Sequence, residues 1–208
     1  VLAERLRDDA VEPRALLAAA RPVSPAALDE LQRLFEAGKG RFYAGQHEQA
    51  LAQLKQALEG LERAPPTART WQLLGAARVQ QGLALLAIGK KEAGREAFRR
   101  VLRVDSGWSL DPDDYSPSTI AVFEATRVEL KGAARAGLSV RSQPVGAEVF
   151  IDGAPAGKTP LSAALPKGTY GLTLTLGKQV SFTRAVKLDR DATLQVDLGF
   201  ESRLSPQL

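Results

Sequence analysis

The residues of this sequence that could do chemistry are scattered, and the nearest approach to a known signature is a fragment of a phosphate-binding loop. Gly157-Lys158-Thr159 matches the end of Gly-x-x-x-x-Gly-Lys-Thr, but the preceding Gly153 stands one residue too close. Pro160 follows directly, where such a loop needs the free amides of a helix N-terminus, and a strand is expected there instead. The segment therefore predicts a turn between strands and no nucleotide site.

An acidic run gives a second partial signature, that of a calcium-binding loop. Asp111, Asp113 and Asp114 suggest such a loop, because Asp111 and Asp113 have the spacing of its first two ligands. Tyr115 and Ser116, however, occupy the positions of the third oxygen ligand and of the obligatory glycine. We interpret the run as a turn in which aspartates cap backbone amides.

The sequence also lacks the usual groups of nucleophilic and metal-assisted catalysis. His47 is the single histidine, and the spacing shows no serine or cysteine partner for it. Cysteine is absent, which excludes thiol nucleophiles, Cys-ligated zinc and disulfides within this chain. A glycosidase-like pair of carboxylates assembled between domains stays open, although nothing in the sequence points to one. We expect no enzyme, no cofactor and no metal site.

The composition is that of an ordinary folded protein. With 208 residues and 44% hydrophobic content, the chain can bury one core or two modest ones. Its 28 basic and 24 acidic residues leave a net charge of only +4, so a nucleic-acid partner is not expected. No apolar run reaches the length of about 18 residues that a transmembrane helix needs. Because methionine is absent, we expect the chain to begin after processing or to be part of a longer protein.

The spacing of hydrophobic residues changes once, near residue 135, and this change predicts two domains. Up to residue 134 the apolar residues recur at intervals of three and four, which places them on one face of a helix. From residue 135 they alternate, as in strands with one buried face, and the last such run contains Leu194, Val196 and Leu198. We expect an α+β protein, with an antiparallel helical-hairpin array over 1–134 and a small all-β sandwich of antiparallel strands over 135–208.

An internal repeat is visible in the helical part. Gly45 aligns with Gly89 at an offset of 44 residues, and Gly38 and Gly82 each lie seven residues earlier. The pattern, over about residues 27 to 105, resembles the tetratricopeptide repeat, although the usual period of that family is about 34 residues. Two repeats cannot cover both of their exposed faces, so flanking helices before Arg21 and after residue 117 are expected as caps.

The tetratricopeptide resemblance implies a protein-docking groove. Arrays of this family hold a peptide or a protein helix on the concave surface that their first helices form. Carried over by position, the groove residues would be Gln32, Phe35, Lys39, Phe42, Tyr43, Val79, Leu83 and Leu86. The alternative that the apolar residues among them belong to the core stays open.

Five short motifs between residues 137 and 200 resemble those of the PEGA domain. The family is named for Pro-Glu-Gly-Ala, which here reads Pro-Val-Gly-Ala, and it continues with a strand, Asp-Gly, Gly-x-Thr-Pro and Pro-x-Gly-x-Tyr. The motif residues are Pro144, Gly146, Ala147, Asp152, Gly153, Gly157, Thr159, Pro160, Gly168 and Tyr170. We expect them to be structural, since the glycines permit turns and the prolines suit strand edges. The resemblance implies a surface or envelope module.

Together these patterns predict a non-enzymatic scaffold or adaptor in the periplasm or on the surface of a Gram-negative bacterium. It would dock a protein partner through the helical groove and use the β domain for packing or surface attachment. Two alternatives stay open. One is a carbohydrate- or peptidoglycan-binding module with Lys158, Lys167 and Thr169 at its site. The other is a regulatory or sensor region of a larger receptor or kinase.

Overall fold

The computed structural model describes residues 25–204, and these residues form two compact units that divide between Ala133 and Ala134. The first unit is helical and the second consists mainly of strands, so the predicted α+β fold class with two domains is confirmed. The capping helix expected before Arg21 lies outside the described residues. None of the described helices is both long and apolar enough to cross a membrane.

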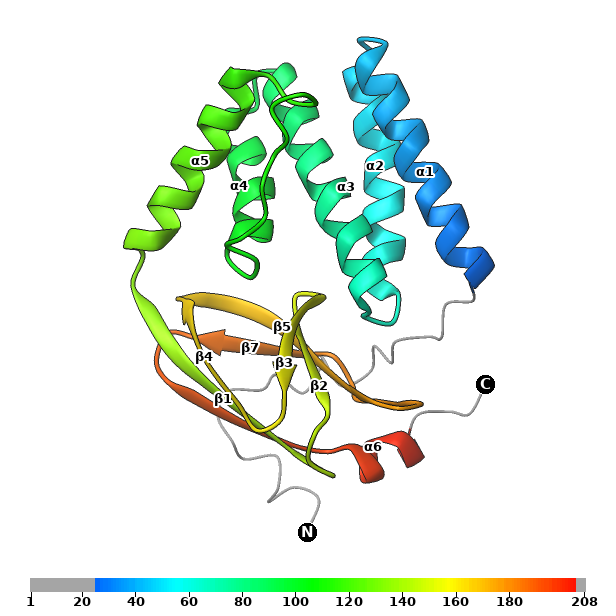
Figure 1. Cartoon of the computed structure of the whole chain (residues 1–208). Helices are drawn as coiled ribbons and strands as arrows, with labels where there is room; N and C mark the ends of the chain where they lie inside the picture. Colours follow the sequence, from blue (N-terminus) through cyan, green and yellow to red (C-terminus); the bar gives the residue numbers. More distant parts are fainter. Residues whose placement is uncertain (1–24, 205–208) are drawn as a thin grey trace. The chain divides into compact units, whose positions relative to one another are not determined.

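The helical unit contains two antiparallel helix pairs followed by a fifth helix (Figure 1). The helices are α1 (Pro25–Tyr43), α2 (His47–Arg63), α3 (Ala68–Ala87), α4 (Lys91–Leu102) and α5 (Pro117–Gly132). The hydroxyl of Ser116 caps α5 by accepting a hydrogen bond from the Thr119 amide at 3.3 Å, and Pro117 occupies the first turn, where its missing N–H costs nothing. This helix is the cap predicted after residue 117.

The two helix pairs repeat one another in backbone detail. Gly45 ends α1 with φ +76° and Gly89 ends α3 with φ +77°, a conformation that favours glycine. The amide of Gly45 donates to the carbonyl of Phe42, and the amide of Gly89 donates to that of Leu86, both at 3.0 Å. Gly45 and Gly89, like Phe42 and Leu86, lie 44 residues apart, which is the offset predicted from the sequence.

The close approach within each pair repeats as well. A Cβ atom added to Gly38 would lie 2.9 Å from the side chain of Leu54 in α2. The same addition to Gly82 would lie 2.4 Å from the ring of Phe98 in α4. A glycine in the first helix of each pair therefore makes room for a large core side chain of the second helix.

The connection from α4 to α5 departs from a simple hairpin array. We call residues 103–116 the connecting segment. It packs on the N-terminal half of α3 through Trp108, and its far end reaches the C-terminal end of α1, where Tyr115 lies near Tyr43. Since α1 and α3 run in the same direction, the C-terminal end of α1 lies beside the C-terminal end of α3. The connecting segment therefore runs along α3 toward that end, and α5 then runs parallel to α4 (Figure 1).

The β unit contains eight strands in two sheets and one short helix. The elements are β1 (Arg135–Gln143), β2 (Glu148–Ile151), β3 (Ala154–Lys158), β4 (Leu161–Pro166), β5 (Gly168–Leu176), β6 (Gln179–Val180), β7 (Arg184–Leu188), β8 (Ala192–Asp197) and α6 (Leu198–Leu204). One sheet has the order β4-β1-β8, and the other has β3-β2-β5 with both β6 and β7 pairing with β5. Each strand pair is antiparallel except β1 and β8, which are parallel.

Two expectations for the β unit were wrong in detail. The β1–β8 pair is not antiparallel, because the chain builds the whole second sheet between these strands before it returns to β1. Leu198 does not continue the last strand but begins α6, since the Asp197 carboxylate accepts a hydrogen bond from the Phe200 amide at 2.8 Å and so starts the helix. Its buried side chain nevertheless belongs to the core.

Candidate functional site

Only some of the residues predicted to line a docking groove are exposed. Phe35, Val79 and Leu83 are buried and belong to the core, which is the structural alternative that the sequence left open. Leu86 is half-buried and lies close to Gly94 of α4. Of the three predicted groove residues on α3, only Leu86 therefore keeps partial exposure.

The connecting segment covers the N-terminal half of α3. The ring of Trp108 lies over Gly75, where an added Cβ atom would come within 2.4 Å of it. The same ring meets Trp71 edge-on with a centroid separation of 5.8 Å, and the Trp71 indole N–H donates to Asp105 at 3.3 Å. An internal segment of the chain thus covers the face of α3 that carries Trp71 and Gly75.

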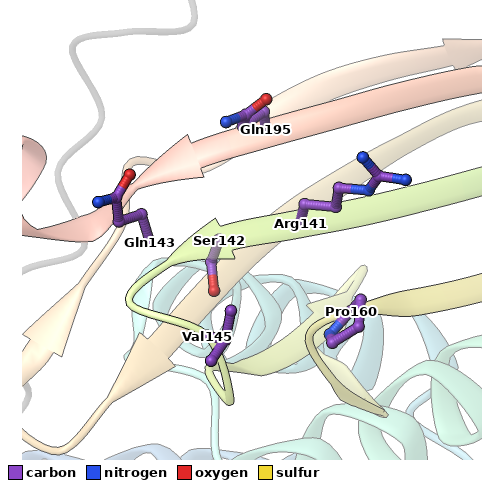
Figure 2. A pocket seen from close by; sticks show the side chains of 6 residues that line it. All are labelled: Arg141, Ser142, Gln143, Val145, Pro160 and Gln195. Carbon is purple, nitrogen blue, oxygen red and sulfur yellow. The ribbon is translucent and has the colours of Figure 1, made fainter.

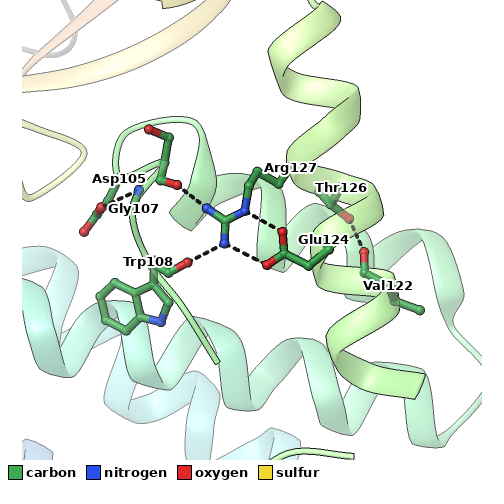
Figure 3. Close-up of polar contacts among 8 residues, drawn as sticks. Asp105, Gly107, Trp108, Val122, Glu124, Thr126 and Arg127 are labelled. Atoms are coloured by element: carbon green, nitrogen blue, oxygen red, sulfur yellow. Dashed lines mark hydrogen bonds and ion pairs between the residues drawn. The ribbon is translucent and has the colours of Figure 1, made fainter. Parts of the chain in front are cut away.

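Arg127 of α5 fixes the connecting segment in place (Figure 3). Its guanidinium donates to the carbonyl oxygen of Trp108 at 2.6 Å and also to that of Ser106. It forms an ion pair with Glu124 at 2.8 Å. One cation therefore binds two backbone carbonyls and a carboxylate, a role for which the five donors of arginine are suited.

The Glu124 carboxyl should titrate below its ordinary range. The hydrogen bond from Arg127 lowers the pKa of Glu124, and the positive charges of Arg127 and Lys131 act in the same direction. The folded-state pKa of Glu124 therefore lies below its unfolded value, which is about 4.3 for glutamate. The ion pair stabilises the fold at pH values above the unfolded pKa, and this contribution is lost as the pH falls through the folded-state pKa. An NMR titration should show a lower midpoint for Glu124 in the native chain than in Arg127→Gln, and equal midpoints would contradict this ion pair.

The remaining predicted groove residues gather toward the end of α1. Gln32 is exposed and accepts a long hydrogen bond from Arg69 at 3.4 Å. Lys39 and Phe42 are half-buried, and Tyr43 is 61% exposed. These positions follow α1 toward its C-terminus, where aromatic residues accumulate.

Four residues at this end form what we call the aromatic cluster: Phe42, Tyr43, His47 and Tyr115. The ring centroid of Phe42 lies 5.4 Å from that of Tyr43 and 5.2 Å from that of His47. Burial raises the pKa of the Tyr115 hydroxyl, and the nearby Tyr43 and Asp114 raise it further. Tyr115 joins this cluster because the connecting segment returns to α1, and this return has no local signal in the sequence.

The described residues contain no group of three or more histidine, aspartate or glutamate side chains placed to hold a metal ion. Asp111 instead closes a turn, since its carboxylate accepts a hydrogen bond from the Asp113 amide at 2.9 Å. Asp113 and Asp114 are exposed beside Tyr115 and form no ion pair with the residues that the structure describes.

In the β unit, several motif residues meet at one hydroxyl group. The Thr159 hydroxyl, in the turn between β3 and β4, accepts hydrogen bonds from the amides of Gly146 and Ala147, both at 3.1 Å. It also lies 2.5 Å from the Ser142 hydroxyl, which in turn donates to the carbonyl of Pro144 at 2.6 Å. Thr159 therefore fixes the loop that follows β1.

The other motif residues hold the β2–β3 turn and the β5 strand. Asp152 and Gly153 form the turn with φ values of +51° and +87°. The Asp152 carboxylate accepts from the Gly171 amide at 2.8 Å, and the Tyr170 hydroxyl donates to the carbonyl of Pro166 at 2.5 Å. These contacts tie the strands of the unit together.

A shallow hollow of about 580 Å³ opens beside the fixed loop (Figure 2). Its lining residues are Arg141, Ser142, Gln143, Val145, Pro160 and Gln195. Lys158, Lys167 and Thr169, which the carbohydrate alternative places at a site, are exposed but do not line this hollow. No local pattern in the sequence marks the hollow, because β1 and β8 become neighbours only through their long-range parallel pairing.

These features define a protein with a unit of paired helices and a small two-sheet β unit. Residues 135–204 match the family model of the PEGA domain, which covers the β unit from β1 through α6. PEGA domains are typically extracellular or periplasmic modules. The tetratricopeptide resemblance of the helical unit is not confirmed by a family match. Searches of curated proteins and of solved structures gave no significant match.

Proposed function

We propose that this chain is a non-enzymatic adaptor of the periplasm or cell surface of a Gram-negative bacterium, and that its helical unit docks a protein partner through the aromatic cluster. The observation that carries the proposal is the exposure of Tyr43, which is 61% accessible although it contacts the ring of Phe42. Tyrosine is enriched among the residues that dominate binding energy in protein interfaces, because it offers apolar area and a polar hydroxyl at low entropic cost.

The charges around the cluster indicate the chemistry of the partner. Asp113 and Asp114 stand exposed beside Tyr115 without an ion-pair partner among the described residues. Aromatic faces and carboxylates both attract a lysine or arginine side chain. Arg41 does not neutralise the acidic group in this structure, since its guanidinium donates to Gln46 and Gln49. We therefore expect a partner segment that carries a basic residue.

Site-specific photocrosslinking in the native host tests the docking surface. A photoreactive amino acid at position 43 should give one discrete protein adduct, which mass spectrometry then identifies. The matched control is position 128, because Val128 is also an exposed apolar residue of the helical unit, at 66% accessibility. Equal adducts at positions 43 and 128, or none at position 43, would overturn the proposal.

Affinity measurements with the identified partner give the second test. Tyr43→Ala should weaken binding by roughly tenfold or more, as expected for a central interface tyrosine. The double substitution Asp113→Asn, Asp114→Asn should weaken binding and reduce its dependence on salt. Val128→Ala should leave the affinity within about a factor of two. An unchanged affinity for Tyr43→Ala would contradict a role of the cluster in docking.

A further inference from the structure

We propose that the hollow of the β unit is a second binding site, and that it takes an extended acidic peptide segment in which a carboxylate stands beside an aliphatic side chain. The site is separate from the aromatic cluster and does not depend on the docking function proposed for it. It combines one arginine and two carboxamides, for which the described residues provide no side-chain partner, with an apolar wall on the fixed loop after β1.

The polar groups come from two neighbouring strands. Arg141 of β1 is paired in register with Gln195 of β8, so their side chains project from the same face of the sheet. Gln143 lies two residues further along β1 and therefore on that face as well. All three are exposed, and Arg141 forms no ion pair within the part of the chain that the structure describes.

The apolar wall consists of Val145 and Pro160. Val145 is 73% exposed, which makes it the most accessible large hydrophobic residue among those described. The Thr159 hydroxyl binds the amides of the two residues that follow Val145, so the loop presents this side chain in a fixed position. A preformed wall lowers the entropic cost of binding.

These groups match a peptide carboxylate better than other ligands. A guanidinium presents two parallel donors to a carboxylate, and carboxamides both donate to and accept from the backbone of an extended peptide. Val145 and Pro160 offer contact to an aliphatic side chain. The lining contains no aromatic ring on which a sugar would stack and no second cation to favour a phosphate.

The position of Val145 in the motif supports the same ligand. The PEGA motif has glutamate where this chain has Val145, and Arg141 lines the same hollow. A carboxylate at position 145 would offer Arg141 an internal partner and would repel an acidic ligand. With valine there, the guanidinium is left for a carboxylate from outside.

Binding of defined peptides to the full chain tests the proposal. The probe is an N-acetylated, C-amidated hexapeptide with a central Glu-Leu pair, and the control peptide carries Gln-Leu instead. NMR shifts of the Arg141 guanidinium and of the Gln143 and Gln195 carboxamides should report saturable binding of the first peptide and at least roughly tenfold weaker binding of the second. Equal affinities for the two peptides, or no saturable shift, would overturn the proposal.

Variants separate this site from general charge effects. Arg141→Gln and Val145→Glu should each weaken binding of the Glu-Leu peptide roughly tenfold or more, because the first removes the carboxylate's partner and the second supplies an internal competitor. Arg190→Gln removes an exposed cation of the β unit outside the hollow and should have little effect. A loss of affinity for Arg190→Gln as large as for Arg141→Gln would contradict the site. Tyr43→Ala should leave peptide binding unchanged, so the two proposals can fail independently.

Discussion

Replacing Glu201 with alanine is expected to destabilise the β unit by about 3 to 5 kcal/mol, the usual cost of removing one partner from a buried ion pair. Glu201 of α6 is 5% exposed and forms an ion pair with Arg184 of β7, which is 9% exposed. Its second carboxylate oxygen accepts a hydrogen bond from the Phe182 amide at 3.0 Å. Among the described residues, the alanine variant would leave the buried guanidinium of Arg184 with only the carbonyl of Phe182 as a partner. It would also release α6 from the sheet edge.

The measurement must report on the β unit itself. Both tryptophans, Trp71 and Trp108, lie in the helical unit, so indole fluorescence follows the wrong unit. Urea unfolding followed by the NMR signals of β5 amides is suitable. Glu148→Ala, at an exposed acidic residue of the same unit, should change the free energy of unfolding by less than about 0.5 kcal/mol.

A double substitution distinguishes the lost charge pair from lost packing. Arg184→Met combined with Glu201→Leu replaces the pair by apolar side chains and should recover most of the stability, because no buried charge is left unpaired. If Glu201→Ala costs no more than Glu148→Ala, the ion pair does not hold α6 in solution.

Local patterns in the sequence were enough to predict the two units. Alternation of apolar residues predicted the buried faces of the strands, as in Leu172 and Leu174 of β5, because a strand repeats every two residues whatever its partners. The two glycines that end α1 and α3, Gly45 and Gly89, predicted the repeat, because a positive φ at a helix end favours glycine.

Contacts between distant segments could not be predicted in the same way. The fit of Trp108 over Gly75 depends on the connecting segment turning back along α3, and a glycine inside a helix does not say which ring will cover it. The same limit explains why residues that are buried were predicted to line the groove. Val79 has the spacing of a first-helix face, but that pattern cannot separate a face that contacts solvent from one that another segment covers. The buried pair of Arg184 and Glu201 likewise has no local signal.

The candidate sites depend on such distant contacts even more strongly. Tyr43 was expected to face a partner, but its neighbour Tyr115 joins the cluster only through the path of the connecting segment. Arg141 and Gln195 share a face only because β8 returns beside β1 in parallel. The PEGA motif residues, by contrast, were recognised from their order alone, and the structure shows that they hold loops and strands together.

Thr159→Val should destabilise the β unit by about 2 to 3 kcal/mol, although valine has nearly the same shape as threonine. The substitution removes the acceptor for the Ala147 amide, and Ala147 is fully buried, so this donor would lose its partner away from water. The Gly146 amide keeps a second acceptor, the carbonyl of Thr159 at 3.0 Å, and Ser142 keeps its bond to Pro144. The expected loss is therefore dominated by one orphaned amide and the broken bond to Ser142.

The exposed Thr169 of β5 provides the matched control, because Thr169→Val makes the same chemical change at a solvent-facing position. Its free energy of unfolding should stay within about 0.5 kcal/mol of the native chain. Thr159→Val should also weaken binding of the Glu-Leu hexapeptide, since the loop that presents Val145 loses its fixed position. The peptide affinity should be measured at urea concentrations well below the unfolding midpoint, where the β unit is still folded. A loss of affinity there reports the position of the loop and not the loss of overall stability. Equal losses of stability for Thr159→Val and Thr169→Val would show that the hydroxyl of Thr159 does not fix the loop.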